Sequence, residues 1–258
     1  MPRVAVTVRR SDSDSISGSE ERTRFEAFEV EVAERASILD VLLELQRGPA
    51  PDLAFRFSCR VGMCGSCAMV VNGREQLTCS TLVKSIGPSL RLEPLRNLPS
   101  IRDLVPDLSP LFNAYRKAMP HFVPRPGLET FAMLPPESAA AKTLLDQPQC
   151  IDCGSCYSAC TLATLHPRYL GPMALHRAAI LIADPRDGAT SERMKIASAE
   201  DGAFRCRTLG NCGAACPRGI SPTLSIQRIK RRAVFFQLRA VWNWLLGRKP
   251  KGVHGTAG

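Results

Sequence analysis

The sequence lacks the long apolar segments that mark membrane-spanning and exported proteins. No stretch approaches the about 18 to 20 uninterrupted apolar residues of a transmembrane helix. The N-terminus, MPRVAVTVRRSDSDS, has no apolar run like that of a secretory signal. Aromatic residues are also few, at 6%. We therefore expect a chain that does not itself span a membrane and that folds in a reducing, cytoplasmic setting.

Acidic residues are missing from the C-terminal segment. Between Arg228 and Lys251 the chain carries eight Lys or Arg residues and no Asp or Glu, and the whole chain has a formal net charge of +10. Such a basic block indicates an anionic partner: a membrane surface, an acidic protein face or nucleic acid. Nothing nearby resembles a nucleic-acid-binding motif, so we expect no nucleic-acid partner.

Cysteine, in contrast, is abundant, with 11 residues in a chain of 258. A disulfide scaffold is the usual explanation only in short secreted chains. Four of the cysteines follow the plant-type ferredoxin spacing, C-x4-C-x2-C and then a more distant cysteine, which predicts a 2Fe–2S cluster. These four are Cys59, Cys64, Cys67 and Cys79.

The other seven cysteines form two copies of the bacterial run C-x2-C-x2-C-x3-C, and the second copy has Leu209 at its second position. In two-cluster ferredoxins the fourth cysteine of each run binds the cluster of the other run. This rule predicts a 4Fe–4S site formed by Cys150, Cys153, Cys156 and Cys216. We expect the remaining site to hold 3Fe–4S on three thiolates, those of Cys160, Cys206 and Cys212.

Three clusters of different kinds in one chain indicate electron transfer. A cluster held entirely by sulfur has no open position for a substrate, so we expect no catalytic residue here and chemistry that happens on partners. Two alternatives stay open. Cysteine quartets can bind structural zinc, although two interlocked runs disfavour it. The site with Leu209 could also be a 4Fe–4S site with a non-cysteine ligand, although RTLGN contains no Asp or His.

The hydrophobic pattern of the first hundred residues predicts a small mixed sheet. Period-two segments at 3–10 and 24–32 are joined by a polar hairpin loop at 11–20. Ser37 opens a helix, with Asp40 completing a capping box, and Asn72-Gly73 predicts a type I′ hairpin turn. A sheet gripping one helix beside a cysteine loop is the β-grasp arrangement of plant-type ferredoxins.

Proline and helical patterns dominate the rest of the chain. Half of the 20 prolines lie between Pro88 and Pro136, which predicts an irregular connector with one helix starting near Ser109-Pro110. Helical patterns follow at 137–147, 171–184, 191–199 and 221–246. The predicted fold class is therefore α+β. We expect a β-grasp 2Fe–2S domain at 1–105 and an all-helical, bacterial-ferredoxin-like domain at 106–258.

The order of these motifs resembles the iron–sulfur subunit of the succinate dehydrogenase and fumarate reductase family, respiratory complex II. The resemblance runs through CRVGMCGSC, IRDLVPD, CIDCGSCYSAC and CRTLGNCGAACPRGISP. It implies a flavoprotein partner that interconverts succinate and fumarate on covalent FAD, and a membrane-anchor subunit with quinone. Electrons would pass between flavin and quinone through 2Fe–2S, 4Fe–4S and 3Fe–4S. It also implies a peripheral location on the cytoplasmic face of the bacterial inner membrane.

A second candidate is the iron–sulfur subunit of a soluble flavin-linked oxidoreductase, such as a thiol-coupled fumarate reductase. Such an enzyme usually carries an added C-terminal cysteine-rich domain, which we do not expect here. The cysteines at 59–79 disfavour those flavin-linked relatives that lack a β-grasp domain.

The quinone-site pattern of the family does not carry over directly. In many succinate dehydrogenases the last cysteine of the first run precedes a proline and then a tryptophan, whereas Thr161 follows here, and Arg207 replaces a familiar histidine. His166, Tyr169 and Arg207 are weak substitutes, and His166 and His176 are expected to be ordinary surface or helix histidines. The C-terminal helix is expected either to pack in the core or to dock on the anchor subunit, through Phe235, Phe236, Trp242 and Trp244.

Overall fold

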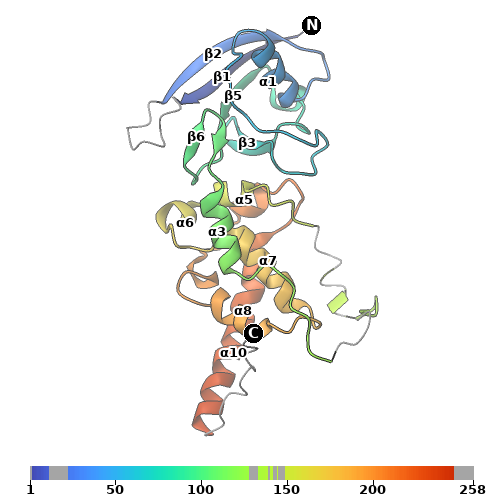
Figure 1. Ribbon diagram of the computed structural model, residues 1–258, viewed down its shortest axis with the longest axis vertical. Helices are drawn as coiled ribbons and strands as arrows, with labels where there is room; N and C mark the ends of the chain where they lie inside the picture. The colour runs from blue at the N-terminus through green and yellow to red at the C-terminus, as the bar shows by residue number, and fades with distance from the viewer. Residues whose placement is uncertain are drawn as a thin grey trace, which may run out of the picture.

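A mixed sheet forms one end of the elongated molecule, and the long C-terminal helix extends at the opposite end (Figure 1). The computed structural model covers residues 1–258 and describes residues 2–11, 23–127, 133–138, 140–141, 144 and 149–246. Most of the hairpin loop predicted at 11–20 and most of the helix predicted at 137–147 lie outside the described residues.

The N-terminal sheet has five strands in the order β2-β1-β5-β3-β4. Their bounds are β1 Arg3–Ser11, β2 Thr23–Glu31, β3 Ala68–Val71, β4 Arg74–Leu77 and β5 Ser89–Glu93. β1 is antiparallel to β2 and parallel to β5, while β3 is antiparallel to both β4 and β5. The two period-two strands are therefore confirmed to within one residue at each end.

One helix covers the buried face of this sheet. Alternate residues of β1, Val4, Val6 and Val8, are buried and share a core with helix α1, Ile38–Arg47. The predicted capping box is confirmed. The Ser37 hydroxyl accepts a hydrogen bond from the Asp40 N–H at 3.2 Å, and the Ser37 N–H donates to the Asp40 carboxylate at 2.8 Å. These bonds satisfy backbone groups that have no partner within the helix.

The β3–β4 hairpin turns where the sequence predicts. Asn72 and Gly73 have φ of 48° and 80°, the positive values that a type I′ turn requires at both central positions. The short turn brings the strands into register, with Val71 opposite Arg74. It thereby places the end of β4 beside the first cysteine loop.

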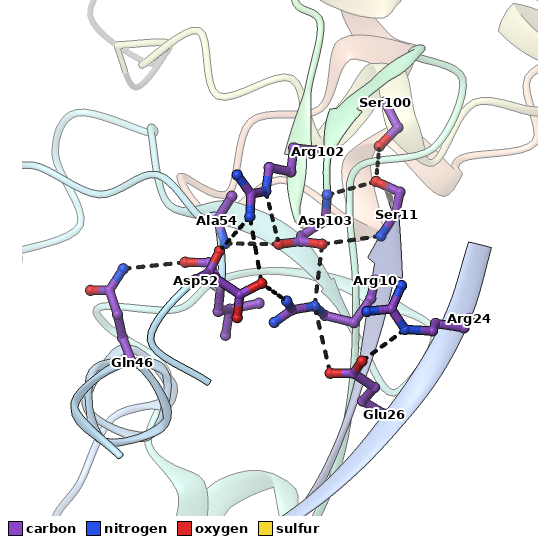
Figure 2. Close-up of polar contacts among 11 residues, drawn as sticks. Arg10, Ser11, Arg24, Glu26, Gln46, Asp52, Ala54, Ser100, Arg102 and Asp103 are labelled. Carbon is purple, nitrogen blue, oxygen red and sulfur yellow. Dashed lines mark hydrogen bonds and ion pairs between the residues drawn. The ribbon is translucent and has the colours of Figure 1, made fainter. Parts of the chain in front are cut away.

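A buried carboxylate joins the end of β1 to a second, smaller hairpin (Figure 2). Asp103 lies in the turn between β6, Ser100–Arg102, and β7, Val105–Pro106, and is 1% exposed. Its oxygens accept hydrogen bonds from the backbone N–H groups of Ser11 at 3.0 Å and Ala54 at 2.9 Å. The guanidinium of Arg10, itself buried, lies 3.4 Å away. This one side chain therefore ties together three segments that are distant in sequence.

Helices make up the C-terminal region. The first of them, α3 Ser109–Lys117, begins at the predicted position with Pro110 in its first turn. The helices with described bounds that follow are α5 Ser155–Ser158, α6 Thr161–Leu165, α7 Gly171–Ala183, α8 Thr190–Ala197, the 3-10 turn η2 Ala203–Arg205, α9 Asn211–Ala214 and α10 Pro222–Leu245. The short helix α2, Val83–Ile86, belongs to the sheet domain. No helix within the described residues is long and apolar enough to cross a membrane.

Helix α7 is the centre of the helical region, and α10, α8 and α3 pack around it. The turn between α7 and α8 is held by a fully buried ion pair, in which Arg193 Nη1 lies 2.5 Å from Asp187 Oδ1. Arg193 also donates to the carbonyl oxygens of Met119 at 2.9 Å and His121 at 2.8 Å. The proline-rich connector is thereby fastened to the helical core.

Replacing Asp103 with alanine tests the junction in the sheet domain. The substitution removes one of the three carboxylates near the buried Arg10 guanidinium, with Glu26 and Asp52 remaining, and it leaves two backbone N–H groups without acceptors. We expect it to lower the free energy of unfolding by about 3 kcal/mol, because each buried N–H group without an acceptor costs about 1 to 3 kcal/mol. Chemical denaturation of the full chain, followed by circular dichroism, measures the change.

The matched control is Glu31→Ala, which removes the exposed ion pair between Arg3 and Glu31. Exposed pairs contribute about 0 to 1 kcal/mol, so this variant should unfold almost as the parent does. Equal effects of the two substitutions would contradict the role given to Asp103.

Candidate functional site

The first cysteine loop connects Phe57 to β3 and folds back on itself around sulfur. Backbone N–H groups of Val61, Met63 and Cys64 lie 3.5, 3.3 and 3.3 Å from Cys59 Sγ. The Gly62 N–H lies 3.3 Å from Cys79 Sγ, and positive φ at Gly62 and Gly65, 72° and 73°, permits this curvature. Cys67 Sγ lies 3.3 Å from Cys79 Sγ. The structure thus gathers the predicted first set: Cys59, Cys64, Cys67 and Cys79.

The environment of this first set favours charge at one sulfur and opposes it at another. Hydrogen bonds from the backbone N–H groups of Val61, Cys64 and Met63 lower the pKa of Cys59 to about 6. Burial, with the neighbouring Cys67 thiol, raises the pKa of Cys79 to about 11. Because thiolate is the form that binds metal, a bound cation is what would keep Cys79 deprotonated near neutral pH.

The second set surrounds a single cavity. Four cysteines line it: Cys150, Cys153, Cys156 and Cys216. Met173, Ile220 and His176 are also among its lining residues. Burial raises the pKa of Cys156, and the Cys153 and Cys150 thiols add to this effect. Burial, with Arg177 and Arg228 nearby, lowers the pKa of His176 to about 4.

The run that supplies three of these cysteines is shaped by one glycine. Gly154 has φ of 78° and precedes α5. A Cβ at this position would lie 3.2 Å from Leu111 Cδ2 and 3.4 Å from Leu95 Cδ1. Cys156 and Cys160 lie within and just after α5, so this one turn of helix separates the second set from the third.

The third set contains the three remaining cysteines. The Cys212 and Cys206 thiols are close enough to Cys160 to help burial raise its pKa. Cys206 Sγ accepts a hydrogen bond from the Thr208 N–H at 3.3 Å, and Cys212 Sγ lies 3.1 Å from Thr223 Oγ1. The structure thus brings together Cys160, Cys206 and Cys212, the three cysteines that the sequence assigns to the third site.

Leu209 and Tyr169 differ in their exposure to solvent. The Leu209 side chain is 62% exposed, whereas Tyr169 is 1% exposed. Burial and the nearby Cys206, Cys160 and Cys212 thiols raise the pKa of Tyr169. Of the three weak quinone candidates, Tyr169 is thus a buried wall of the third set. His166 is partly buried, and Arg207 is exposed.

The first and second sets meet through backbone. A Cβ added at Gly65 would lie 2.7 Å from Cys153 Cβ and 2.8 Å from the Ile151 carbonyl oxygen, so only glycine fits without displacing one of the loops. Cys67, Cys79, Ile151 and Cys153 also share one small apolar cluster. The loops that carry the first two sets are therefore in direct contact.

A side chain from the sheet domain fixes the end of α5. Asn97 Nδ2 donates to the carbonyl oxygens of Tyr157, Ser158 and Cys160 at 2.9, 3.0 and 2.9 Å. The Arg96 N–H donates to the Ser158 hydroxyl at 2.8 Å. Asn97 orients the segment between the second and third sets. The sequence analysis missed it, because its partners lie about sixty residues away and no local pattern marks it.

The donor sets fit iron–sulfur clusters. Four thiols around one cavity, and three around another position, are the ligand sets of polynuclear clusters. Among the described residues, no three Cys, His, Asp or Glu side chains converge to hold a single metal ion. Backbone N–H groups directed at sulfur, as at Cys59, are the contacts that tune such clusters.

Comparison with known proteins supports the same interpretation. Residues 5–113 match a 2Fe-2S iron-sulfur cluster binding domain, and residues 142–217 match a 4Fe-4S dicluster domain. The chain is 37% identical over 220 residues to the fumarate reductase iron-sulfur subunit of Mycobacterium tuberculosis, covering 83% of this chain and 88% of the relative.

A plant relative and a solved structure agree. The identity is 38% over 201 residues with a mitochondrial succinate dehydrogenase iron-sulfur subunit of Oryza sativa, covering 75% of this chain and 70% of the relative. A chain of the Mycobacterium smegmatis Sdh1 complex in the apo form superposes with a TM-score of 0.80 at 28% identity, covering 92% of this chain and 98% of that one. The chain therefore belongs to the family of iron–sulfur subunits of succinate dehydrogenases and fumarate reductases.

Proposed function

We propose that this subunit carries electrons through three clusters between the FAD of a flavoprotein partner and a quinone at a membrane-anchor subunit. The observation that supports the proposal most directly is the succession of the three cysteine sets. The first touches the second at Gly65, and α5 links the second to the third. Each cluster accepts and releases one electron at a time, which suits transfer between a flavin and a quinone.

This arrangement supports the ligand assignment that the cysteine spacings predict. The 2Fe–2S cluster would be held by Cys59, Cys64, Cys67 and Cys79, and the 4Fe–4S cluster by Cys150, Cys153, Cys156 and Cys216. The 3Fe–4S cluster would be held by Cys160, Cys206 and Cys212. The protein's own contribution is to direct N–H groups at sulfur, to bury Cys212, and to fix the spacing of the sets. None of these residues acts on succinate or fumarate.

The strand order and the single covering helix support the β-grasp interpretation of the first domain. We retain the proposed division into a 2Fe–2S domain at 1–105 and a helical domain at 106–258. The matched region of the first family model extends to residue 113, into α3.

Helix α10 supports a membrane-anchor partner. Its Phe235, Leu238 and Trp242 side chains are 73%, 60% and 62% exposed, while Phe236 packs partly against the helical core. Phe235, Leu238 and Trp242 are therefore available to dock on an anchor subunit, whereas Phe236 packs against the core of the helical region. The Trp244 side chain lies outside the described residues. Exposed apolar side chains among many Lys and Arg suit a surface at a membrane, and the proposed location is peripheral, on the cytoplasmic face of the inner membrane.

Electron paramagnetic resonance tests the proposal. The purified protein should give a signal from a reduced 2Fe–2S, a reduced 4Fe–4S and an oxidised 3Fe–4S cluster, with about nine iron atoms per chain. Replacing Leu209 with cysteine should supply a fourth thiolate to the third site. The signal of the oxidised trinuclear centre should then disappear, and the iron content should rise to about ten.

The control is Leu238→Cys, which adds a thiol at an exposed leucine of α10 outside the three sets. It should leave all three signals as they are. A trinuclear signal that persists unchanged in Leu209→Cys would contradict the assignment of the third site.

A second prediction concerns the contact between the first two sets. Gly65→Ala forces the two loops apart, because the new Cβ would lie under 3.0 Å from Cys153 and Ile151. We expect electron transfer from the reduced 2Fe–2S cluster to the 3Fe–4S cluster to slow severalfold, because electron tunnelling becomes slower as the distance between two clusters grows. Rapid freeze-quench measurements after mixing with succinate would follow both signals.

Gly73→Ala is the matched control for this experiment. Gly73 has a similar positive φ of 80°, but the nearest atom to its added Cβ is the end of the Arg96 side chain at 3.9 Å. Both alanine variants therefore introduce backbone strain at a positive φ, but only Gly65→Ala also introduces a collision between two loops. Equal slowing in both variants would show that strain, and not the spacing of the loops, explains the effect.

A further inference from the structure

His176 is a buried histidine that lines the cavity of the second cysteine set. It lies on α7, is 2% exposed, and lines the same cavity as the four thiols. The sequence alone predicts an ordinary surface or helix histidine at this position. In the structure, however, this histidine lies in the wall of a cavity that four cysteines also line.

One nitrogen of the imidazole is held by α10. His176 Nδ1 lies 2.8 Å from the hydroxyl oxygen of Ser225, which is itself buried. That hydroxyl has a second possible acceptor in the Ser221 carbonyl oxygen, at the longer distance of 3.5 Å. The shorter distance favours Nδ1 as the acceptor of the Ser225 proton. The ring hydrogen of the neutral imidazole is then on Nε2.

The other nitrogen has no partner within the described part of the chain. His176 Nε2 is buried and makes no hydrogen bond there. A buried donor without an acceptor is destabilising and is uncommon in native proteins. The cavity that His176 lines is the one where the proposed function puts a sulfur-rich cluster, and both sulfide and cysteine sulfur accept hydrogen bonds.

We propose that His176 donates a hydrogen bond from Nε2–H to a sulfur atom of the 4Fe–4S cluster and thereby raises its reduction potential. The proposal rests on the assignment of that cluster to Cys150, Cys153, Cys156 and Cys216. Those four thiolates already supply the cluster's ligands, so the imidazole acts through sulfur and does not bind iron. Reduction adds one electron to the cluster, and a hydrogen bond to sulfur stabilises the more negative state.

The first test is spectroscopic and uses the wild-type protein with its copurifying subunits. The protein is labelled with ¹⁵N-histidine, and the reduced 4Fe–4S signal is examined by pulsed electron–nuclear spectroscopy. A weak nitrogen coupling that disappears in His176→Leu is the expected result. A strong coupling, as from a nitrogen bound to iron, would overturn the hydrogen bond, and so would the absence of any coupling.

The second test measures the reduction potential of the same cluster by redox titration. His176→Leu should shift it to a lower value, because the donor is lost while an apolar side chain of similar size remains. In His176→Gln the side-chain amide can present an N–H group at about the same reach, so this variant should recover part of the wild-type reduction potential. An unchanged potential in His176→Leu, with the cluster intact, would contradict the proposal.

His121→Leu is the control for both tests. His121 is exposed, and its backbone carbonyl oxygen, not its imidazole, accepts the hydrogen bond from Arg193. The variant should keep the wild-type potential and the wild-type nitrogen coupling. A wild-type protein without any 4Fe–4S signal would overturn the proposed function itself, whereas a normal signal without nitrogen coupling would overturn only the role of His176.

Discussion

The close backbone contact between Gly65 and Cys153 is the constraint on which the electron path depends. The first and second cysteine sets come from different domains, and only a residue without a side chain allows their loops to approach this closely. The sheet, its hairpin turn and the Asp103 junction hold one side of this contact. The connector and α5 hold the other side, with Asn97 bonded to the carbonyl oxygens at the end of α5. The fold is thus arranged to fix distances between sulfur sets.

Charge is the second constraint. Burial and mutual repulsion raise the pKa of several cysteine thiols, most clearly at Cys156. Thiolates in such surroundings require bound cations, so folding of these loops and assembly of their clusters are coupled. Backbone N–H groups, the Thr223 hydroxyl and the imidazole of His176 are the neutral polar groups that lie near these sulfurs. Such groups can change the reduction potentials of the clusters without adding a competing ligand.

Short-range features were predictable from the sequence, and long-range ones were not. The Ser37 capping box, the Asn72-Gly73 turn and the cysteine spacings depend on neighbours within a few residues, and each pattern has a mechanism that can be read locally. Asn97 binds carbonyl groups about sixty residues away, and His176 lines a cavity together with cysteines from other loops. Asp103 pairs with β1 across a separation of ninety-two residues. No local pattern carries such information, because the partners meet only once the chain has folded.

The most direct test of the central claim is to locate the iron in the assembled protein by anomalous diffraction at the iron absorption edge. Three separate peaks are predicted, at the Cys59 set, the Cys150 set and the Cys160 set, in that order along the molecule. The third should show three iron atoms on the side away from Leu209. Fewer than three peaks, or a peak that draws Cys160 into the same cluster as Cys150, would contradict this account.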